Sequence, residues 1–358
     1  MRLGLVIYGS LETVSGGYLY DRKLVEHLRR CGDAVEVISV PWRPYGRALL
    51  DNLSPAIFKR LSRGSFDLLL QDELAHPSLC RLNHRLRRRV SYPLVALVHH
   101  LRACEARPAW QNFWYRQVER QYLTSVDGFI CISNTTRHEV EVLTGSGRPA
   151  VVAPPAGDHL PGGLSREQVW QRAGSPGACR LIFVGNLIPR KGLHHLLDAL
   201  ASLPNQDWRL TVIGGSELDP PYARAIRARI AAPRLAGKID LLGRRSREEL
   251  IERLRESHLL VGPSSYEGFG IVYLEAMRFG LPVIAGDAGG PREIVSHGVN
   301  GFLVPPGDPA ALARYLQAFI NNRDLLRRMS LAALASSASH PTWEGSAQRV
   351  RDFLLGFS

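Results

Sequence analysis

The stretch Pro263-Ser-Ser-Tyr-Glu-Gly-Phe-Gly-Ile-Val-Tyr-Leu-Glu-Ala-Met277 joins a glycine-bearing turn to a helix start and carries two glutamates, Glu267 and Glu275. The apolar run 259–262 before it has the pattern of a buried strand, so the whole segment predicts a strand, a turn and a helix. Repeated units of this kind build α/β folds with parallel sheets, which bind ligands beyond the carboxyl ends of their strands. We therefore expect a ligand site here, with Glu267 in the loop and Glu275 on the helix.

The two glutamates predict a polyhydroxylated ligand. Gly268 and Gly270 let the backbone approach a ligand closely, and the helix start offers free N–H groups to its oxygens. Each carboxylate accepts two hydroxyl protons with charge-assisted strength, which suits a sugar better than a bare phosphate. In the alternative interpretation, Glu267 caps the helix and Glu275 lies on a solvated helix face.

Strand-like and helix-like segments alternate along the rest of the chain and form two series. Between the series, residues 154–163 are rich in Pro and Gly and have the composition of a linker. We therefore expect two doubly wound domains, each with a mostly parallel sheet. The expected strands are 3–8, 34–40, 67–71, 94–99, 128–133 and 150–153 in the first series, and 179–184, 209–213, 238–242, 259–262, 282–285 and 301–304 in the second.

A second motif, Gly185-Asn-Leu-Ile-Pro-Arg-Lys-Gly192, follows the expected strand 179–184 and precedes a helix. Gly185 permits a tight turn, and Arg190 and Lys191 stand just before the helix N-terminus. Two fixed cations beside free N–H groups suit a diphosphate, and they would stabilise the negative charge that grows on a departing nucleoside diphosphate. The alternative is a basic pair that is only solvated.

The first half of the chain carries two further candidate groups at strand ends. Gly16 and Gly17 follow the first expected strand. His99 and His100 end the strand expected at 94–99, and strand alternation points them to opposite sides. All four residues are expected at the carboxyl edge of their sheet. A simple glycine turn and a hydrogen-bonded structural histidine are the alternatives, and the G-x-G-x-x-G fingerprint of nicotinamide dehydrogenases is absent.

The motifs at 185–192 and 263–277 resemble the signature of the retaining nucleotide-sugar glycosyltransferases of glycosyltransferase family 4. The resemblance covers nearly the whole chain and is weakest from 41 to 89. It implies an α/β fold of the GT-B type, with two Rossmann-like doubly wound domains facing across a cleft. The implied parts are an acceptor-binding domain at 1–160, a nucleotide-sugar-binding domain at 175–340 and a C-terminal helix within 341–358 that packs back on the first domain.

The same resemblance implies a role for each candidate residue. Glu267 meets the transferred sugar, Glu275 meets the nucleotide ribose, and the backbone near Leu242 and Arg244 frames the base. The loop 288–294 helps to close the pocket. The implied catalytic residues are His99, Arg190, Lys191 and Glu267. The implied donor-binding residues are Gly16, Gly17, Gly185, Asn186, Arg190, Lys191, Leu242, Arg244, Glu267, Gly268, Phe269, Gly270, Ile271, Val272 and Glu275.

Composition limits the class of protein. A chain of 358 residues with 45% hydrophobic content is long enough for two domains with their own cores. It contains no apolar run of the roughly 18 residues that a membrane-spanning helix needs, so we expect a cytoplasmic protein. The five scattered cysteines argue against a disulfide framework. Neither Asp-x-Asp nor a His/Asp/Glu cluster at metal-ligand spacing occurs, so we expect a reaction without metal or cofactor, in which Arg190 and Lys191 replace a divalent cation.

The net charge of +12 is densest in the segment Arg81-Leu-Asn-His-Arg-Leu-Arg-Arg-Arg89. This segment predicts either a peripheral contact with an anionic membrane, a contact with a phosphorylated acceptor, or a solvated helix face. No nucleic-acid-binding motif accompanies the basic residues, so nucleic acid is not an expected partner. An aromatic group at helical spacing either lies in the core or meets an interface, and we expect the core. It comprises Trp110, Phe113, Trp114 and Tyr115.

Together these features predict a retaining glycosyltransferase that moves a hexose-type sugar from a UDP-, GDP- or ADP-linked donor to an acceptor hydroxyl. Two alternatives stay open at this point. One is a GT-B sugar-nucleotide epimerase, and the other is a catalytically inactive scaffold that binds a nucleotide sugar. The sequence leaves the sugar, the base and the acceptor undetermined, and a lipid, a polysaccharide, a secondary metabolite and a small polyol are all candidate acceptors.

Overall fold

The chain forms two compact units in a computed structural model that describes residues 1–145, 147–204 and 207–357. Unit 1 comprises Met1–Pro155 together with Pro341–Ser358, and unit 2 comprises Ala156–His340. The sequence placed the first domain at 1–160 and began the second at 175. In the structure, residues 156–174 belong to unit 2.

Residues 156–163, which are most of the Pro/Gly-rich segment, belong to unit 2 and pack on that unit's helix α12 (Ile271–Arg278). Gly157 lies so close to the backbone of Leu274 that a side chain would not fit between them. Arg278 donates a hydrogen bond of 2.7 Å to the carbonyl of Leu160. A composition typical of a linker thus forms a strap that is fixed to one unit.

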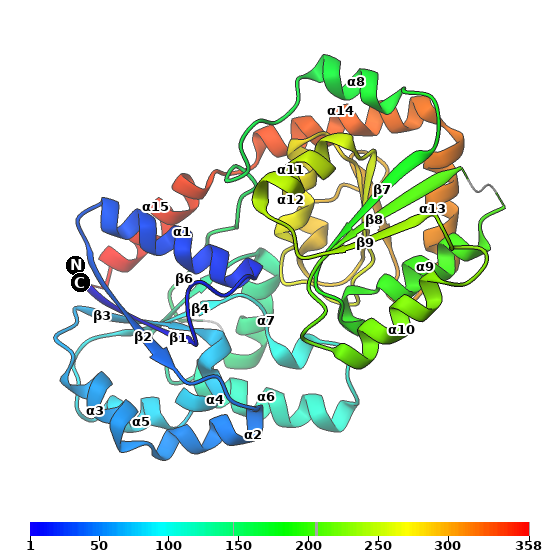
Figure 1. Cartoon of the computed structure of the whole chain (residues 1–358). Helices are drawn as coiled ribbons and strands as arrows, with labels where there is room; N and C mark the ends of the chain where they lie inside the picture. The colour runs from blue at the N-terminus through cyan, green and yellow to red at the C-terminus, as the bar shows by residue number, and fades with distance from the viewer. Residues whose placement is uncertain (146, 205–206, 358) are drawn as a thin grey trace. The chain divides into compact units, whose positions relative to one another are not determined.

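Unit 1 contains a six-stranded parallel sheet in the order β2-β1-β3-β4-β5-β6 (Figure 1). Strands β3 and β4 are buried along their whole length, as expected for strands covered on both faces; β4 is entirely apolar, and β3 begins with three leucines. The strands are β1 (Arg2–Tyr8), β2 (Ala34–Val40), β3 (Leu68–Asp72), β4 (Leu94–Val98), β5 (Gly128–Cys131) and β6 (Ala150–Val152).

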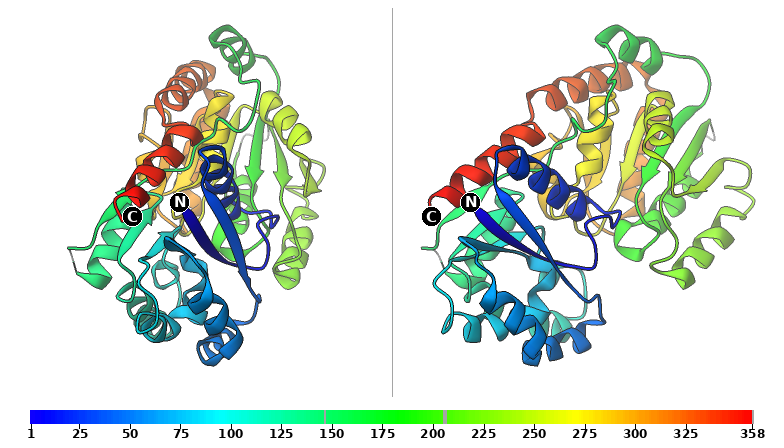
Figure 2. Two further views of the ribbon diagram at one scale, coloured as in Figure 1. Left: turned by 90° about the vertical axis from the view of Figure 1, so that its left-hand side faces the viewer. Right: turned by 60° about the vertical axis from the view of Figure 1, so that its left-hand side comes forward.

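Helices cover both faces of this sheet. In the strand order, β2 lies on one side of β1, whereas β3, β4, β5 and β6 follow one another on the other side. Because the crossovers between parallel strands are right-handed, α1 therefore lies on the face opposite the helices that connect the later strands. Helix α15 shares the face of α1, and α2 to α6 form a layer on the other face (Figure 2). The helices are α1 (Gly16–Arg30), α2 (Tyr45–Ala48), α3 (Pro55–Arg63), α4 (His76–Leu79), α5 (Leu82–Leu86), α6 (Ala109–Leu123), α7 (Asn134–Thr144) and α15 (Trp343–Leu355), with 3-10 turns η1 (Leu49–Leu53), η2 (Glu73–Ala75) and η3 (Arg102–Cys104).

Unit 2 repeats this architecture with a parallel sheet in the order β12-β11-β10-β7-β8-β9. Helix α9 contacts α10 and α13, and the apolar faces of the three helices enclose the core with the sheet. The strands are β7 (Cys179–Val184), β8 (Trp208–Ile213), β9 (Ile239–Gly243), β10 (Leu259–Gly262), β11 (Val283–Gly286) and β12 (Gly301–Val304). The remaining elements are α8 (Arg166–Ala173), η4 (Pro189–Lys191), α9 (Leu193–Ser202), α10 (Pro220–Ile230), α11 (Arg247–Glu256), α12 (Ile271–Arg278), η5 (Gly290–Glu293), α13 (Pro309–Asn321) and α14 (Arg323–Ser339).

Every strand expected from the sequence forms, and no boundary differs by more than two residues. Each sheet also has a point at which the direction of the chain reverses. In unit 1 the neighbours β1 and β3 lead to opposite sides of the sheet, and in unit 2 the neighbours β7 and β10 do so. The loops that leave such a pair diverge and leave room for a ligand beyond the carboxyl ends of the strands. The topology therefore places one candidate site in each unit.

The C-terminal helix α15 packs within unit 1, against α1. Trp343 meets the ring of Tyr20 edge-on, with ring centroids 5.6 Å apart. Arg351 donates a hydrogen bond of 2.7 Å to the buried carboxylate of Asp33. The range predicted for this helix ended at Ser358, which lies outside the described residues. Among the described residues, no helix has the length and apolar character that a membrane span requires.

The aromatic group on α6 is not in the core, so this expectation was wrong. The exposed fractions of Trp110, Phe113 and Trp114 are 66%, 56% and 63%. Helix α6 is buried through its later turns, at Glu119, Tyr122 and Leu123, and its first turns extend past the packed layer. Tyr115 is half-buried, because its ring packs edge-on against that of Tyr45 with centroids 4.8 Å apart.

Replacement of Trp343 by Ala is expected to lower the free energy of unfolding by about 3 kcal/mol or more, because it leaves a cavity between α15 and α1. Unfolding in urea, followed by circular dichroism, measures the change. The matched control is Trp110→Ala on the exposed face of α6, which is expected to change stability by less than about 0.5 kcal/mol. Equal stability of the Trp343→Ala protein and the wild type would contradict the packing described for α15.

Candidate functional site

In unit 2, three of the predicted residues form one cluster at the carboxyl ends of β7 and β10. Lys191 Nζ lies 2.5 Å from Glu267 Oε1, and Arg190 Nη1 lies 3.5 Å from Glu267 Oε2. The same Arg190 nitrogen donates a hydrogen bond of 2.7 Å to the carbonyl of Tyr266. Two adjacent cations therefore meet a carboxylate that is distant in the sequence. They meet at the neighbours β7 and β10, where the order of strands in the sheet of unit 2 reverses.

Glycines allow the loops to reach this arrangement. Gly192 ends the turn η4 with a left-handed φ of 72°, and any side chain there would clash with the carbonyl of Pro263. Gly185 faces the aliphatic part of Lys191, where an added Cβ would lie 3.5 Å from Cδ. At the start of α12, Gly270 has a φ of 104° and the helix has no side-chain cap. Glu267 therefore does not cap the helix, which rules out that interpretation of it.

Two residues that the sequence did not single out complete the cluster. Ser264 is buried and donates a hydrogen bond of 2.6 Å to Glu267 Oε1. Tyr273 is buried under the turn, and its hydroxyl donates to the carbonyl of Gly262 at 3.0 Å. The loop expected at 288–294 also contributes, because Gly290 donates its N–H to the carbonyl of Glu267 at 2.9 Å. These contacts fix both the side chain and the backbone of Glu267.

The charges in the cluster shift the pKa values of Glu267 and Lys191. Burial alone would raise the pKa of Glu267, but the charges of Lys191 and Arg190 and the hydrogen bonds from Lys191 and Ser264 lower it to about 2. Burial lowers the pKa of Lys191, and Arg190 adds to this effect while Glu267 opposes it. Glu267 is therefore an anion at any physiological pH. Its carboxylate is available to accept hydrogen bonds from ligand hydroxyls.

Glu275 lies apart from this cluster, on the buried side of α12. Its exposed fraction is 9%, and its Oε1 lies 3.1 Å from Nε2 of His159 in the strap 156–163. The interpretation of Glu275 as a solvated helix residue is therefore wrong. Within the described residues, no hydrogen bond or ion pair joins its carboxylate to Glu267, Lys191 or Arg190.

The other predicted donor-binding residues of unit 2 lie at the ends of β7 and β9, on the turn before α12 or in the first turn of α12. Asn186 accepts a hydrogen bond of 3.3 Å from the N–H of Gly215. Arg244 follows β9 and pairs with Glu217 at 3.3 Å, and both side chains lie beside Gly215. Leu242 is half-buried in β9, and Gly268 and Phe269 are buried while Ile271 and Val272 are half-buried.

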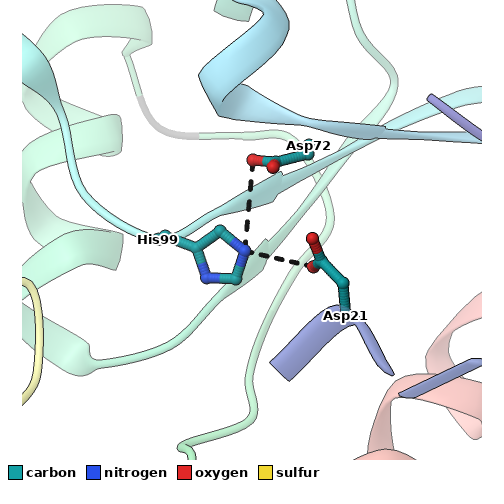
Figure 3. Close-up of side chains that lie close together, drawn as sticks. All are labelled: Asp21, Asp72 and His99. Atoms are coloured by element: carbon teal, nitrogen blue, oxygen red, sulfur yellow. Dashed lines mark hydrogen bonds and ion pairs between the residues drawn. The ribbon is translucent and has the colours of Figure 1, made fainter. Parts of the chain in front are cut away.

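In unit 1, the predicted residue His99 lies between two buried carboxylates (Figure 3). Its Nε2 is 3.2 Å from Asp21 Oδ1 on α1 and 4.0 Å from Asp72 Oδ1 at the end of β3. Asp72 also accepts the N–H of Leu74 at 2.9 Å. The neighbouring His100 instead pairs with Glu105 at 3.0 Å, so the two histidines have different partners, as strand alternation predicted.

Helix α1 fixes the ring of His99 as well as its nitrogen. Ser15 caps this helix, and Gly16 and Gly17 form its first turn, so the two glycines are helical and do not form a loop. A Cβ on Gly17 would lie 3.4 Å from Cδ2 of His99, which means that the helix backbone packs directly against the ring. Tyr20 meets the ring edge-on at 5.5 Å.

The charges around His99 favour its protonated form. Burial would lower the pKa of His99, but the hydrogen bond and charge of Asp21, followed by the charges of Asp72 and Glu73, raise it to about 9. Burial raises the pKa of Asp72 to about 7, and the charge of Asp21 adds to this effect while His99 opposes it. As the pH rises, Asp72 therefore loses its proton before His99 does.

Among the described residues, the fold brings together two groups of side chains of types that can bind metals, which sequence spacing did not indicate. One is Asp21, Asp72 and His99, and the other is Glu73, His76 and Glu119. In the first group, Asp21 lies at hydrogen-bond distance from His99 Nε2, at 3.2 Å, and Asp72 lies farther away, at 4.0 Å, so both carboxylates face the same imidazole nitrogen. In the second, His76 contacts Glu73 at 2.9 Å, and burial lowers the pKa of His76 to about 4.

Comparison with known families assigns both units. Residues 18–158 match the family model described as Glycosyltransferase Family 4, and residues 167–335 match the model described as Glycosyl transferases group 1. The chain belongs to glycosyltransferase family 4. This confirms the resemblance carried by the motifs at 185–192 and 263–277.

This family 4 glycosyltransferase is similar to the phosphatidyl-myo-inositol mannosyltransferase of Mycobacterium leprae, with 28% identity over 98% of the chain and 95% of the relative. It is 31% identical to a D-inositol 3-phosphate glycosyltransferase of Nocardia farcinica, over 64% of the chain and 52% of that relative. Among solved structures, sucrose-phosphate synthase from Thermosynechococcus elongatus has a TM-score of 0.82 at 20% identity, with 99% and 98% of the two chains covered. HepE of Anabaena in complex with UDP-glucose has a TM-score of 0.79 at 21% identity, with 99% and 100% covered. These matches confirm the GT-B fold.

The sequence did not single out five residues of the glycosyltransferase's candidate sites. They are Asp21, Asp72, His159, Ser264 and Tyr273. The signal for Asp72 was available, because it ends an apolar strand at the carboxyl edge, as His99 does. Asp21 follows Gly17 by one helical turn, which places it on the same face of α1. His159 and Ser264 reach their partners through the packing of loops, and no sequence pattern marks them.

Replacement of Ser264 by Ala is expected to lower the free energy of unfolding by about 1–3 kcal/mol, because it removes a buried hydrogen bond to the charged Glu267. Thermal or urea unfolding measures this change. The neighbouring variant Ser265→Ala is the control, since the Ser265 hydroxyl makes only a long contact of 3.4 Å with the carbonyl of Arg190. Equal losses in the two variants would show that Ser264 does not stabilise the cluster through Glu267.

Proposed function

We propose that this glycosyltransferase is a retaining enzyme that transfers a hexose-type sugar from a nucleoside diphosphate sugar to a hydroxyl of its acceptor. The observation that supports this most is the Glu267 carboxylate, held between Lys191 and Arg190 where the sheet of unit 2 changes direction. A nucleoside diphosphate sugar requires cations for its phosphates and hydrogen-bond acceptors for its hydroxyls. This cluster offers both chemistries side by side.

Arg190 and Lys191 bind the diphosphate in this proposal. When the bond between the anomeric carbon and the phosphate oxygen breaks, its electron pair stays on that oxygen, and fixed cations stabilise the growing charge. Both cations already have fixed positions, because Arg190 donates to the carbonyl of Tyr266 and Lys191 to Glu267. Preorganised cations of this kind take the part of a divalent metal ion, so the proposed reaction is metal-independent.

The two glutamates take different parts of the donor. Glu267, with the backbone of Gly268–Gly270, accepts hydroxyl protons of the transferred sugar, and its low pKa keeps it a carboxylate. Glu275 binds the ribose hydroxyls, and His159 holds its carboxylate in one orientation. His99, in unit 1, contacts the sugar or the acceptor at the reacting centre. Leu242 and Arg244 frame the base at the end of β9.

The nucleotide and the acceptor are best identified by a binding screen. HepE, which shares the fold, was solved in complex with UDP-glucose, and two sequence relatives are named for inositol-containing compounds. UDP-sugars and inositol derivatives are therefore the first compounds to test, beside GDP- and ADP-sugars. A ligand that binds the folded protein raises its melting temperature, so thermal shift ranks the donors directly.

Two other functions remain in competition with transfer. A sugar-nucleotide epimerase of the same fold would convert the donor without an acceptor, and an inactive scaffold would bind the donor without converting it. Release of nucleoside diphosphate that depends on an added acceptor supports transfer. Acceptor-independent conversion of the donor supports the epimerase, and binding without conversion supports the scaffold.

Replacement of Lys191 by Ala and of Glu275 by Ala is expected to lower the rate of transfer by about tenfold or more in each case, since each change removes a charged contact to the donor. The matched control is Lys238→Ala, which removes the other lysine of unit 2, just before the amino end of β9. Nucleoside diphosphate release is measured with and without EDTA, which also tests metal independence. Wild-type rates in Lys191→Ala and Glu275→Ala proteins would remove these assignments.

We further propose that this is a cytoplasmic protein that contacts an anionic bilayer through the helix layer α2 to α6 of unit 1. The segments 41–63, 81–89 and 109–123 of this layer hold two acids, Asp51 and Glu119, and both are buried. The exposed charged residues of these segments are therefore all basic. Exposed apolar side chains lie among them, with Trp42 63%, Leu50 65% and Leu53 71% exposed, in addition to the aromatic group on α6. Basic and aromatic side chains together suit the interface of an anionic membrane.

Parts of the segment Arg81–Arg89 also have structural partners, so the basic cluster serves two purposes in this proposal. Arg85 donates to the carbonyl of Asn52 at 2.8 Å and lies over the ring of Phe58. Arg87 pairs with Asp127 at 2.5 Å. Arg88 and Arg89 are exposed, and within the described residues no ion pair involves their side chains. They remain available for lipid phosphates.

Simultaneous replacement of Trp110, Phe113 and Trp114 by Ala is expected to weaken binding to phosphatidylglycerol-containing vesicles by about tenfold or more. Each of these exposed rings would bury apolar area in the bilayer, and the alanines would not. Co-sedimentation with vesicles measures binding, and pure phosphatidylcholine vesicles and high salt are expected to abolish it in the wild type. Trp170→Ala, which removes a 44% exposed tryptophan of unit 2, is the control. The proposed surface is wrong if the wild type ignores anionic vesicles, or if Trp170→Ala weakens binding equally.

A further inference from the structure

The arrangement around His99 defines which of its two ring nitrogens faces the protein. Nε2 points to Asp21 at 3.2 Å and to Asp72 at 4.0 Å, and Nδ1 lies at the opposite edge of the ring, directed away from both carboxylates (Figure 3). Among the described residues, no hydrogen bond to Nδ1 is formed. The exposed fraction of the His99 side chain is 14%, so the ring is largely buried and keeps a small exposed surface.

The buried carboxylate of Asp21 depends on His99 as its hydrogen-bond partner. The residue is fully buried in α1, and its second oxygen, Oδ2, accepts no hydrogen bond from any described residue. An ionised carboxylate in such a place is costly unless a cation or a donor faces it. The proton on Nε2 of His99 supplies that donor, and a positive charge on the ring stabilises the carboxylate further.

The titratable groups that face His99 from each packed element are acidic or neutral. They are Asp21 and Tyr20 on α1, Asp72 at the end of β3 and Glu73 in η2. The direct neighbours contribute no positive charge that would compete with the imidazolium. Burial raises the pKa of Tyr20 far above its usual range, so this ring stays neutral.

We infer that Asp21 and Asp72 are positioning residues that hold His99 as an imidazolium, so that its Nδ1–H is a fixed hydrogen-bond donor for a ligand oxygen and His99 does not act as a general base. The inference deepens the proposed function and rests on it for the identity of the ligand, which is the transferred sugar or the acceptor. An imidazolium has no free lone pair, so it cannot take a proton from an acceptor hydroxyl. It can donate a charge-assisted hydrogen bond to a hydroxyl or phosphate oxygen.

The packing around the His99 ring gives the Nδ1–H bond a fixed direction. Gly17 packs against one side of the imidazole and Tyr20 meets it edge-on, so rotation of the ring would bring it into the α1 backbone. The carboxylates fix which nitrogen faces inward, and the helix fixes the plane. The direction of the Nδ1–H bond is thereby set before any ligand arrives, which is the property that a preorganised site needs.

Nuclear magnetic resonance of the full chain with ¹⁵N-labelled histidine tests the charge directly, since the two nitrogens of an imidazolium have similar shifts and the nitrogen that loses its proton moves far from them. The His99 signals are assigned by their loss in His99→Gln. In the wild type they are expected to keep imidazolium shifts from about pH 6 to pH 8, above the ordinary histidine pKa. In Asp21→Asn, whose amide oxygen can still accept the Nε2 proton, the His99 pKa is expected to fall by about one unit or more.

The matched control is Glu105→Gln, which removes the carboxylate beside His100 and is expected to leave His99 unchanged. Asp72→Asn provides a second variant in case Asp21→Asn does not fold. A wild-type His99 that is neutral at pH 7 would overturn the inference, as would a pKa that moves in neither aspartate variant.

Activity then separates positioning from a purely structural role. In Asp21→Asn, nucleoside diphosphate release is expected to fall as the pH rises through the lowered His99 pKa, whereas the wild type shows no such loss below about pH 8. A uniform loss at all pH values in Asp21→Asn would contradict the role of the charge. If no donor is turned over at any pH, the proposed function fails, while the resonance measurement still decides the charge of His99.

Discussion

The ion cluster of Glu267 with Lys191 and Arg190 depends on one constraint, the parallel pairing of β7 with β10. These strands are neighbours in the sheet although about 80 residues separate them in the chain, so the loops that follow them meet at one edge. The buried carboxylate is stable there only because two cations and a serine compensate it. Removal of any partner leaves a charge without compensation, so the sheet and the cluster support each other.

Unit 1 also has buried charged groups at the carboxyl ends of its strands, but of different residue types. Its sheet also reverses direction between neighbours, and the residues gathered there are a histidine and two aspartates in place of two bases and one acid. Unit 2 thus presents cations around an anion, and unit 1 presents anions around a cation. In each case a glycine next to the charged group, Gly185 or Gly17, brings backbone close enough to hold a long or planar side chain in one position.

Much of this architecture was predictable from the sequence, because strand periodicity and glycine motifs are local signals. The strands and the residues Arg190, Lys191 and Glu267 were predicted on that basis. The partners Asp21, Asp72, His159 and Ser264 were not, since each reaches its contact through tertiary packing. The aromatic group on α6 was misplaced for the same reason: helical spacing identifies a face but not what covers it. The Pro/Gly-rich strap was read as a linker, because composition does not reveal packing on α12.

Helix α15 belongs to unit 1 although it follows the whole of unit 2 in the chain. On the ribosome, the strands of unit 1 emerge before unit 2, yet the side of α1 that receives Trp343 stays uncovered until α15 has been made. Unit 2 carries no such dependence, since its segments are contiguous. Unit 1 is therefore begun before unit 2 and completed after it, which leaves this surface of α1 open to chaperones while the residues of unit 2 are translated.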